Sequence, residues 1–95
     1  MKTLLELQKE ISAWASSTFK EQNISSKMKH LTYEVKELAD DPTDGEEMAD
    51  CLILLANLAE MSGLDLFEEA EKKMVKNRLR TWSAPDEDGV CRHIE

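Results

Sequence analysis

The sequence is short of basic residues relative to acidic ones. It holds 12 lysines and arginines against 20 aspartates and glutamates, which gives its 95 residues a net charge of −8. This imbalance argues against binding to nucleic acid or to an anionic membrane surface, because both would repel the chain. For the same reason, a polyphosphate ligand would need cations to mediate its binding.

Cysteine and long hydrophobic runs are also scarce. Cys51 and Cys91 form no Cys-x-x-Cys motif, and Cys51 lies within an apolar segment, which favours a reduced, cytoplasmic protein. The most apolar stretch, residues 48–61, contains Asp50 and Glu60 and is too short to span a bilayer. Polar residues interrupt the apolar core that a signal peptide would need near the N-terminus, so we expect none.

Apolar residues recur at helical spacing in four segments, and no segment alternates convincingly as a strand would. We therefore expect an all-α, four-helix bundle-like domain over residues 1–82, followed by an irregular tail over residues 83–95. A chain of this length buries a limited core, so a homodimer or homotetramer would add stability. The expected helices span about residues 3–20, 25–41, 44–61 and 65–80.

The ends of these helices have recognisable signals. Thr3 with Glu6, and Thr43 with Glu46, have the spacing of capping boxes. The second helix should end before Pro42, and the third should stop at Ser62-Gly63. The third helix is apolar on most sides, which predicts a central position between partners in the same chain or a neighbouring one.

Acidic residues gather where the second expected helix leads into the third. Glu34 and Glu37 are three residues apart on one helix, and Glu47 and Asp50 on the next, so each pair shares a face. A short hairpin connection makes the helices antiparallel neighbours, which brings the four carboxylates together. At an effective dielectric constant of about 20, two charges roughly 5.5 Å apart repel by about 3 kcal/mol. Protonation, a cationic side chain or a metal would relieve this repulsion, and oxygen-only ligation suits Mg²⁺ or Mn²⁺.

The alternative is a solvated acidic turn that binds nothing. The acids of the connection itself fit this interpretation, since acids are favoured at a helix N-terminus. An EF-hand loop beginning at Asp40 is excluded, because its third position is Pro42 and its twelfth, where a glutamate belongs, is Cys51. The acids assigned to the turn are Asp40, Asp41, Asp44 and Glu46.

The fourth expected helix carries a row of donors suited to phosphate oxygens. Lys73, Asn77 and Arg80 fall on one face at positions i, i+4 and i+7. The alternative is that the basic residues favour the helix C-terminus through its dipole and that Lys73 pairs with Glu69. Asn57 is polar within the apolar third helix and should have a partner, either structural or a ligand.

These motifs together resemble the all-α MazG-like nucleoside triphosphate pyrophosphohydrolases, and more narrowly the small dATP/dGTP diphosphohydrolase (MazZ-type) subfamily of bacteria and phages. A single Glu-x-x-Glu motif is common, but several segments in the same order are specific. The resembling segments are WASSTF (14–19), KHLTYEVKEL (29–38), EMADCLILL (47–55), KKMVKNRLRTW (72–82) and DGVCRHI (88–94).

The resemblance implies cleavage of a nucleoside triphosphate, a purine dNTP in this subfamily, to its monophosphate and pyrophosphate. It implies Mg²⁺, with Mn²⁺ as the alternative, and an activated water that attacks the α-phosphorus. Lys73 and Arg80 would stabilise the charge that develops on pyrophosphate, so Lys73 joins the catalytic set. The implied metal ligands, which are also the implied catalytic carboxylates, are Glu34, Glu37, Glu47 and Asp50. The implied substrate contacts are Lys73, Asn77, Arg80, Trp14, Phe19 and His30.

Two other functions compete with this one. A non-catalytic acidic helical module that binds a basic protein would explain the charge and the helices. It would not explain why Asp50 and Asn57 lie within an apolar segment. Within the enzyme class, a housecleaning enzyme that hydrolyses damaged or non-canonical dNTPs would use the same residues.

Overall fold

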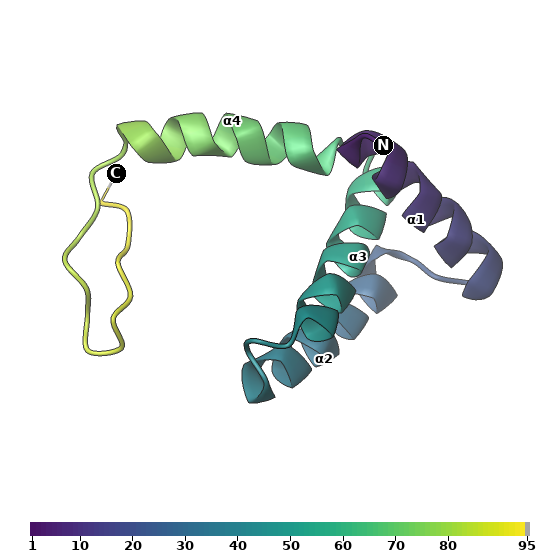
Figure 1. Ribbon diagram of the computed structural model, residues 1–95, viewed down its shortest axis with the longest axis horizontal. Coiled ribbons are helices and arrows are strands. Elements are labelled where there is room, and N and C mark those ends of the chain that lie inside the picture. Colours follow the sequence, from purple (N-terminus) through teal and green to yellow (C-terminus); the bar gives the residue numbers. More distant parts are fainter. Residues whose placement is uncertain (95) are drawn as a thin grey trace.

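The computed structural model describes residues 1–94, which form four helices and no strand (Figure 1). The predicted all-α fold is therefore confirmed. No helix in this part of the chain has the length and apolar character needed to cross a membrane. The helices are α1 (Leu4–Thr18), α2 (Ile24–Asp40), α3 (Gly45–Met61) and α4 (Leu66–Leu79).

Side-chain caps fix where these helices begin. The predicted capping box of α1 is confirmed, because Thr3 and Glu6 each accept a hydrogen bond from the backbone of the other. The helix α2 begins at Ile24, one or two residues earlier than predicted, since Asn23 and Ser26 form a capping box of their own. Residues with short polar side chains compete for the cap position, and their sequence spacing does not decide between them.

The capping box predicted at Thr43 is wrong. Asp44 caps α3 instead, and its Oδ1 accepts a hydrogen bond from the backbone N–H of Glu46 at 2.8 Å. At Thr43 the chain is still in the turn, in which the N–H of Asp44 donates to the carbonyl oxygen of Asp41 at 3.1 Å. Asp44 also places its negative charge at the positive end of the helix dipole, which favours a carboxylate there.

The predicted stop of α3 at Ser62-Gly63 is confirmed. Gly63 has a φ of 71°, a left-handed conformation that glycine adopts without a steric penalty. The N–H of Leu64 donates to the carbonyl oxygen of Ala59 at 2.9 Å, and that of Gly63 to Glu60 at 3.1 Å. These two bonds form a Schellman motif, which ends α3 and turns the chain towards α4.

The helices α1 and α2 both pack against α3, while α4 contacts only α1 and α3 (Figure 1). The start of α4 is held by Gln8, whose side chain is fully buried. Gln8 Nε2 donates to Glu60 Oε1 at 2.9 Å, and its Oε1 accepts from the N–H of Leu66 at 2.9 Å. From this anchor, α4 extends away from the other three helices (Figure 1).

The core is small and centres on one face of α3. Its buried apolar side chains are short or medium in size, and Ala15 of α1 packs with them. The predicted central position of α3 is confirmed for this face only, because Met48, Leu52 and Leu55 on the rest of the helix stay exposed. The buried residues of α3 are Cys51, Leu54, Ala56, Asn57 and Ala59.

After α4 the chain forms a loop that closes on itself without a helix. Trp82 and His93 form an isolated antiparallel bridge, and their rings meet edge to face with centroids 5.9 Å apart. Ser83 donates its N–H to the carbonyl oxygen of Arg92 at 2.8 Å. This loop follows the far end of α4 and lies away from the three packed helices (Figure 1).

Candidate active site

Three carboxylates converge where α2 leads into α3. Glu34 and Glu37 of α2 and Glu47 of α3 each offer one ligand oxygen, and these oxygens all lie within 4.8 Å of one another. The antiparallel hairpin of α2 and α3 brings them together, as the spacing of the two acidic pairs predicted. Asp50 lies beside this group, close enough for its charge to affect Glu47, but it does not belong to the cluster of three.

The electrostatics of the cluster fit a divalent cation. Glu34 Oε2 and Glu47 Oε2 are buried without a hydrogen-bond partner among the described residues. Partial burial raises the pKa of the Glu47 carboxyl, and repulsion from Glu37, Asp44, Asp50 and Glu34 raises it further. Unpaired buried carboxylate oxygens are costly unless a cation satisfies them, and oxygen ligands are the ones that Mg²⁺ and Mn²⁺ prefer.

A cavity of about 220 Å³ begins at these carboxylates and runs between α1, α2 and α3. Glu34 and Asp50 line it at one end. Trp14 of α1 and Phe19, the C-cap residue of that helix, line it as well. The Trp14 and Phe19 rings pack edge to face with centroids 5.4 Å apart. Three of the predicted nucleotide contacts therefore border one cavity next to the carboxylates: Trp14, Phe19 and His30.

His30 links the aromatic part of the cavity to the acidic part. Its ring lies edge to face with Phe19 at a centroid distance of 6.3 Å. Its Nε2 is 3.4 Å from Glu34 Oε1, one helical turn away. His30 can thus hold one oxygen of Glu34 while the other, Oε2, stays free for a ligand.

Sequence reasoning missed Lys27, which also lines this cavity. Lys27 is only 2% exposed, and its ammonium lies 4.6 Å from the centre of the Phe19 ring. Burial lowers the pKa of this ammonium. The signal was present in the sequence, because Lys27, His30, Glu34 and Glu37 follow one face of α2 at helical spacing.

Asn57 lines the cavity from α3, and it has one of the two kinds of partner that the sequence predicted. Its Nδ2 donates to Ser12 Oγ at 3.2 Å, so half of the amide is bound within the protein. Its Oδ1 is buried and has no partner among residues 1–94. This oxygen remains available to a ligand.

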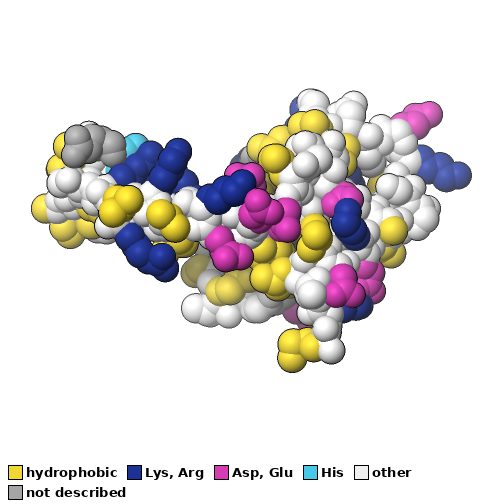
Figure 2. All heavy atoms as spheres, turned by 90° about the horizontal axis from the view of Figure 1, so that it is seen from above, with side chains coloured by type: hydrophobic (Ala, Val, Ile, Leu, Met, Phe, Trp, Pro, Cys, Tyr) yellow, Lys and Arg dark blue, Asp and Glu magenta, His cyan; other side chains and the backbone are white. Residues whose placement is uncertain are grey.

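Within one chain, the donor row of α4 does not meet the carboxylates. The helices α2 and α4 make no contact, and neither Lys73, Asn77 nor Arg80 lines the cavity. Lys and Arg side chains instead gather over the far part of α4 (Figure 2). The ion pair considered for Lys73 is made by Lys72, whose Nζ is 3.1 Å from Glu68 Oε1 and 3.9 Å from Glu69 Oε1. No carboxylate in the described chain lies within ion-pair distance of Lys73.

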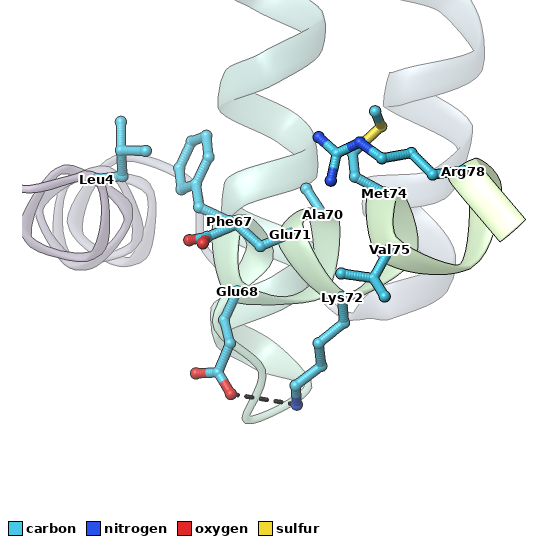
Figure 3. A pocket seen from close by; sticks show the side chains of 9 residues that line it. All are labelled: Leu4, Phe67, Glu68, Ala70, Glu71, Lys72, Met74, Val75 and Arg78. Atoms are coloured by element: carbon cyan, nitrogen blue, oxygen red, sulfur yellow. Dashed lines mark ion pairs between the residues drawn. The ribbon is translucent and has the colours of Figure 1, made fainter.

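The side of α4 drawn in Figure 3 forms an open, mostly apolar hollow of about 610 Å³. Phe67, Met74 and Val75 line it from α4, and Leu4 lines it from the start of α1. The Lys72–Glu68 ion pair lies at its edge (Figure 3). This surface contains none of the clustered carboxylates, so it is separate from the acidic cavity.

The raised pKa of Glu47 leads to a prediction for the metal-free protein. A carboxyl that holds its proton more tightly in the folded state opposes folding when it is charged. The free energy of unfolding therefore falls as the pH rises from the ordinary carboxyl pKa through the raised one. A Glu47→Gln variant carries no charge there, so its urea midpoint without metal should exceed that of the wild type at neutral pH. The difference should shrink towards about pH 4.

Glu46→Gln is the matched control, because Glu46 is exposed in the first turn of α3 and belongs to no cluster. This control removes an acid that favours the helix dipole, so its midpoint should stay the same or fall. Adding Mn²⁺ should raise the midpoint of the wild type more than that of Glu47→Gln. If metal-free Glu47→Gln had a lower urea midpoint than the wild type at neutral pH, this would contradict the conclusion that the charge of Glu47 destabilises the fold.

Comparison with known proteins identifies relatives over nearly the whole chain. A model of the dATP/dGTP pyrophosphohydrolase family matches residues 7–95. A dATP/dGTP diphosphohydrolase of Cyanophage S-2L is 37% identical over 94 residues, which are 97% of this chain and 89% of that protein. Another, from Salmonella phage PMBT28, is 36% identical over 93 residues, and this chain spans only 32% of its length.

A solved structure has the same fold. It is described as the Cyanophage S-2L MazG-like pyrophosphohydrolase bound to dGDP and three catalytic Mn²⁺ ions per active site. It superimposes with a TM-score of 0.86 at 35% identity, and the match covers 100% of both chains. The resemblance and the fold that the sequence predicted are both confirmed.

Proposed function

This chain belongs to the dATP/dGTP pyrophosphohydrolase family, and on that premise we propose that it is a metal-dependent enzyme that hydrolyses purine dNTPs to dNMP and pyrophosphate. One observation carries the proposal. Glu34 and Glu47 have buried carboxylate oxygens without partners among residues 1–94, and Glu34 lines a cavity that Trp14 and Phe19 also border. A nucleotide has the matching polarity, because its phosphates need cations and its base needs a flat apolar surface.

Glu34, Glu37 and Glu47 would hold the metal, with Asp50 beside them as a fourth ligand. We propose Mg²⁺ as the cofactor, with Mn²⁺ able to replace it. When bound, such ions would neutralise the triphosphate and activate water for attack on the α-phosphorus. The protein's own contribution is to hold these carboxylates close together in a partly buried cluster, so that they can bind cations jointly.

The arrangement of the cavity orients the nucleotide. Along α2, Lys27 precedes Glu34 by seven residues, and along α3 Asn57 follows Asp50 by seven. Because a helix rises about 1.5 Å per residue, both polar residues lie about 10 Å along the axis from the carboxylates. Trp14 and Phe19 lie between the helices at that end and would pack against the base, while the phosphates point to the acids.

The site requires a second subunit to supply phosphate donors. Lys73, Asn77 and Arg80 stand on a helix that extends away from the carboxylates of its own chain (Figure 1). The same helix leaves apolar side chains uncovered, with Leu79 83% exposed, and Met48 of α3 is 48% exposed. A homodimer, or a tetramer built from two dimers, would cover these surfaces and place α4 of one subunit against the acids of the other.

The test is a hydrolysis assay with each of the four dNTPs and Mg²⁺ or Mn²⁺. We expect dNMP and pyrophosphate in equal amounts, faster turnover of the purine dNTPs, and no turnover after chelation of the metal. Release of orthophosphate without pyrophosphate would overturn the proposed cleavage. If oxidised dNTPs are hydrolysed in preference to canonical ones in a competition assay, the enzyme is instead a housecleaning hydrolase. No turnover and no saturable Mn²⁺ binding by calorimetry would support the non-catalytic module.

A further inference from the structure

Lys27 is the buried charged group that the proposed chemistry leaves without a role. Its side chain is only 2% exposed, yet no carboxylate in residues 1–94 lies within ion-pair distance of it and no side-chain hydrogen bond from it is formed there. Its neighbour is the face of Phe19, 4.6 Å away, which stabilises a cation only modestly. Burying a lysine to this extent is costly when an aromatic ring is its ammonium's one neighbour of this kind among the described residues, and this indicates a partner that arrives with the ligand.

Asn57, on the opposite helix, also indicates a partner that arrives with the ligand. It is 3% exposed, and its Nδ2 is bound to Ser12 while its Oδ1 has no partner among residues 1–94. Lys27 and Asn57 line the 220 Å³ cavity together, and both also border an adjoining hollow of about 400 Å³. At the end away from the carboxylates, the cavity thus holds a donor without an ion-pair partner and an acceptor without a hydrogen-bond partner among residues 1–94.

We propose that Lys27 is the specificity-determining residue for the base and favours guanine over adenine, with Asn57 as the second contact. The inference rests on the proposed function, because it takes the ligand to be a purine nucleotide. Guanine presents two adjacent acceptors, O6 and N7, which a lysine ammonium can contact at once. Adenine offers N7 beside an amino group that is itself a donor and repels the ammonium.

The acceptor of Asn57 discriminates in the same direction. The N1 atom of guanine carries a hydrogen and can donate to Asn57 Oδ1, next to the O6 that accepts from Lys27. Adenine has an unprotonated N1, which would leave Asn57 Oδ1 facing another acceptor. A site with buried polar groups rejects the base that leaves them unpaired.

A phosphate role for Lys27 is the competing assignment. Lys27 lies about 10 Å along the helix axis from Glu34 of the carboxylate cluster, so a phosphate that contacts Lys27 would lie at the other end of the cavity from the metal ligands. The Phe19 ring lies against Lys27, and Trp14 packs on Phe19, so aromatic surface adjoins Lys27 and this favours the base. The two roles differ in one measurable respect, because a phosphate contact cannot distinguish dGTP from dATP.

The experiment compares kcat/KM for dGTP and dATP in the wild type and in Lys27→Met, which keeps the length of the side chain and removes the donor. We expect the wild type to prefer dGTP. Lys27→Met should lose about 5- to 150-fold with dGTP and stay within about twofold with dATP. The control is Lys29→Met, which removes an exposed lysine from the same helix and should leave both values unchanged. Equal losses with both substrates, or no loss with either, would overturn the proposal.

Binding of dGMP and dAMP, measured by calorimetry without divalent metal, separates this inference from the proposed function. Tighter binding of dGMP that is lost in Lys27→Met would support the role of Lys27 even if no dNTP were hydrolysed. If the Met variant does not fold, Lys27→Arg keeps a donor and should keep the preference for dGMP. Equal binding of the two monophosphates by the wild type would overturn the inference while leaving hydrolysis itself intact.

Discussion

A Glu47→Gln variant should hydrolyse dGTP and dATP at least about 100-fold more slowly than the wild type, because a metal ligand contributes several kcal/mol to stabilising the transition state. Glu47 is chosen because, in the described part of the chain, it is the member of the carboxylate cluster on α3 and its Oε2 is buried without a hydrogen-bond partner. Glutamine keeps the size of the side chain and one oxygen but removes the negative charge. The measurement is kcat/KM with saturating Mn²⁺, together with the Mn²⁺ affinity from calorimetry.

Glu46→Gln is again the matched control, since it removes the same charge one residue away and should retain most of the activity. Together with the urea experiment, the pair separates catalysis from folding. Glu47→Gln should be inactive although it is more stable than the wild type without metal. A Glu47→Gln variant with wild-type turnover would refute the metal cluster as the catalytic centre.

Two inactive variants should restore activity when they are mixed. Lys73→Ala alone is expected to lose about 10- to 100-fold through loss of a charged hydrogen bond to phosphate. In a mixture with Glu47→Gln, after unfolding and refolding together, about half the dimers pair one variant with the other, and each has one intact site. The mixture should therefore recover about a quarter of the wild-type activity per chain.

Lys76→Ala serves as the control for α4, because Lys76 is exposed on the same helix but does not belong to the row of Lys73, Asn77 and Arg80. This variant should remain active by itself. Sedimentation should show a dimer or larger assembly at micromolar concentration. If the mixed sample stays as inactive as its components, donors and acids are not shared between subunits.

The sequence alone predicted most of the features that depend on local interactions. Helical periodicity and end signals gave four helices, and only the exact caps at Asn23 and Asp44 differed, because several polar residues compete for one cap. The pairing of Glu34 and Glu37 with Glu47 also followed from the sequence. Two helices that are joined by a short hairpin connection lie antiparallel, so residues near the turn on the facing sides come together.

Lys27 was missed for a different reason. A lysine is almost always exposed, and its place on the acidic face of α2 does not reveal that Phe19 from α1 covers it. Only the packing of α1 across the α2–α3 pair turns Lys27 from a solvated charge into a buried one that has no ion-pair partner among residues 1–94. The same packing buries Asn57 and ties half of its amide to Ser12.

The sequence by itself determined four helices and the meeting of the acidic pairs, because helix spacing and a short hairpin are local constraints. Tertiary structure alone decided where α4 points. Its start is fixed by the side chain of Gln8, which donates hydrogen bonds to Glu60 and Leu64 and accepts one from the N–H of Leu66, all more than 50 residues away along the chain. That long-range anchor separates Lys73, Asn77 and Arg80 from the carboxylates of their own chain, and no periodicity in the sequence encodes the direction of a helix in space.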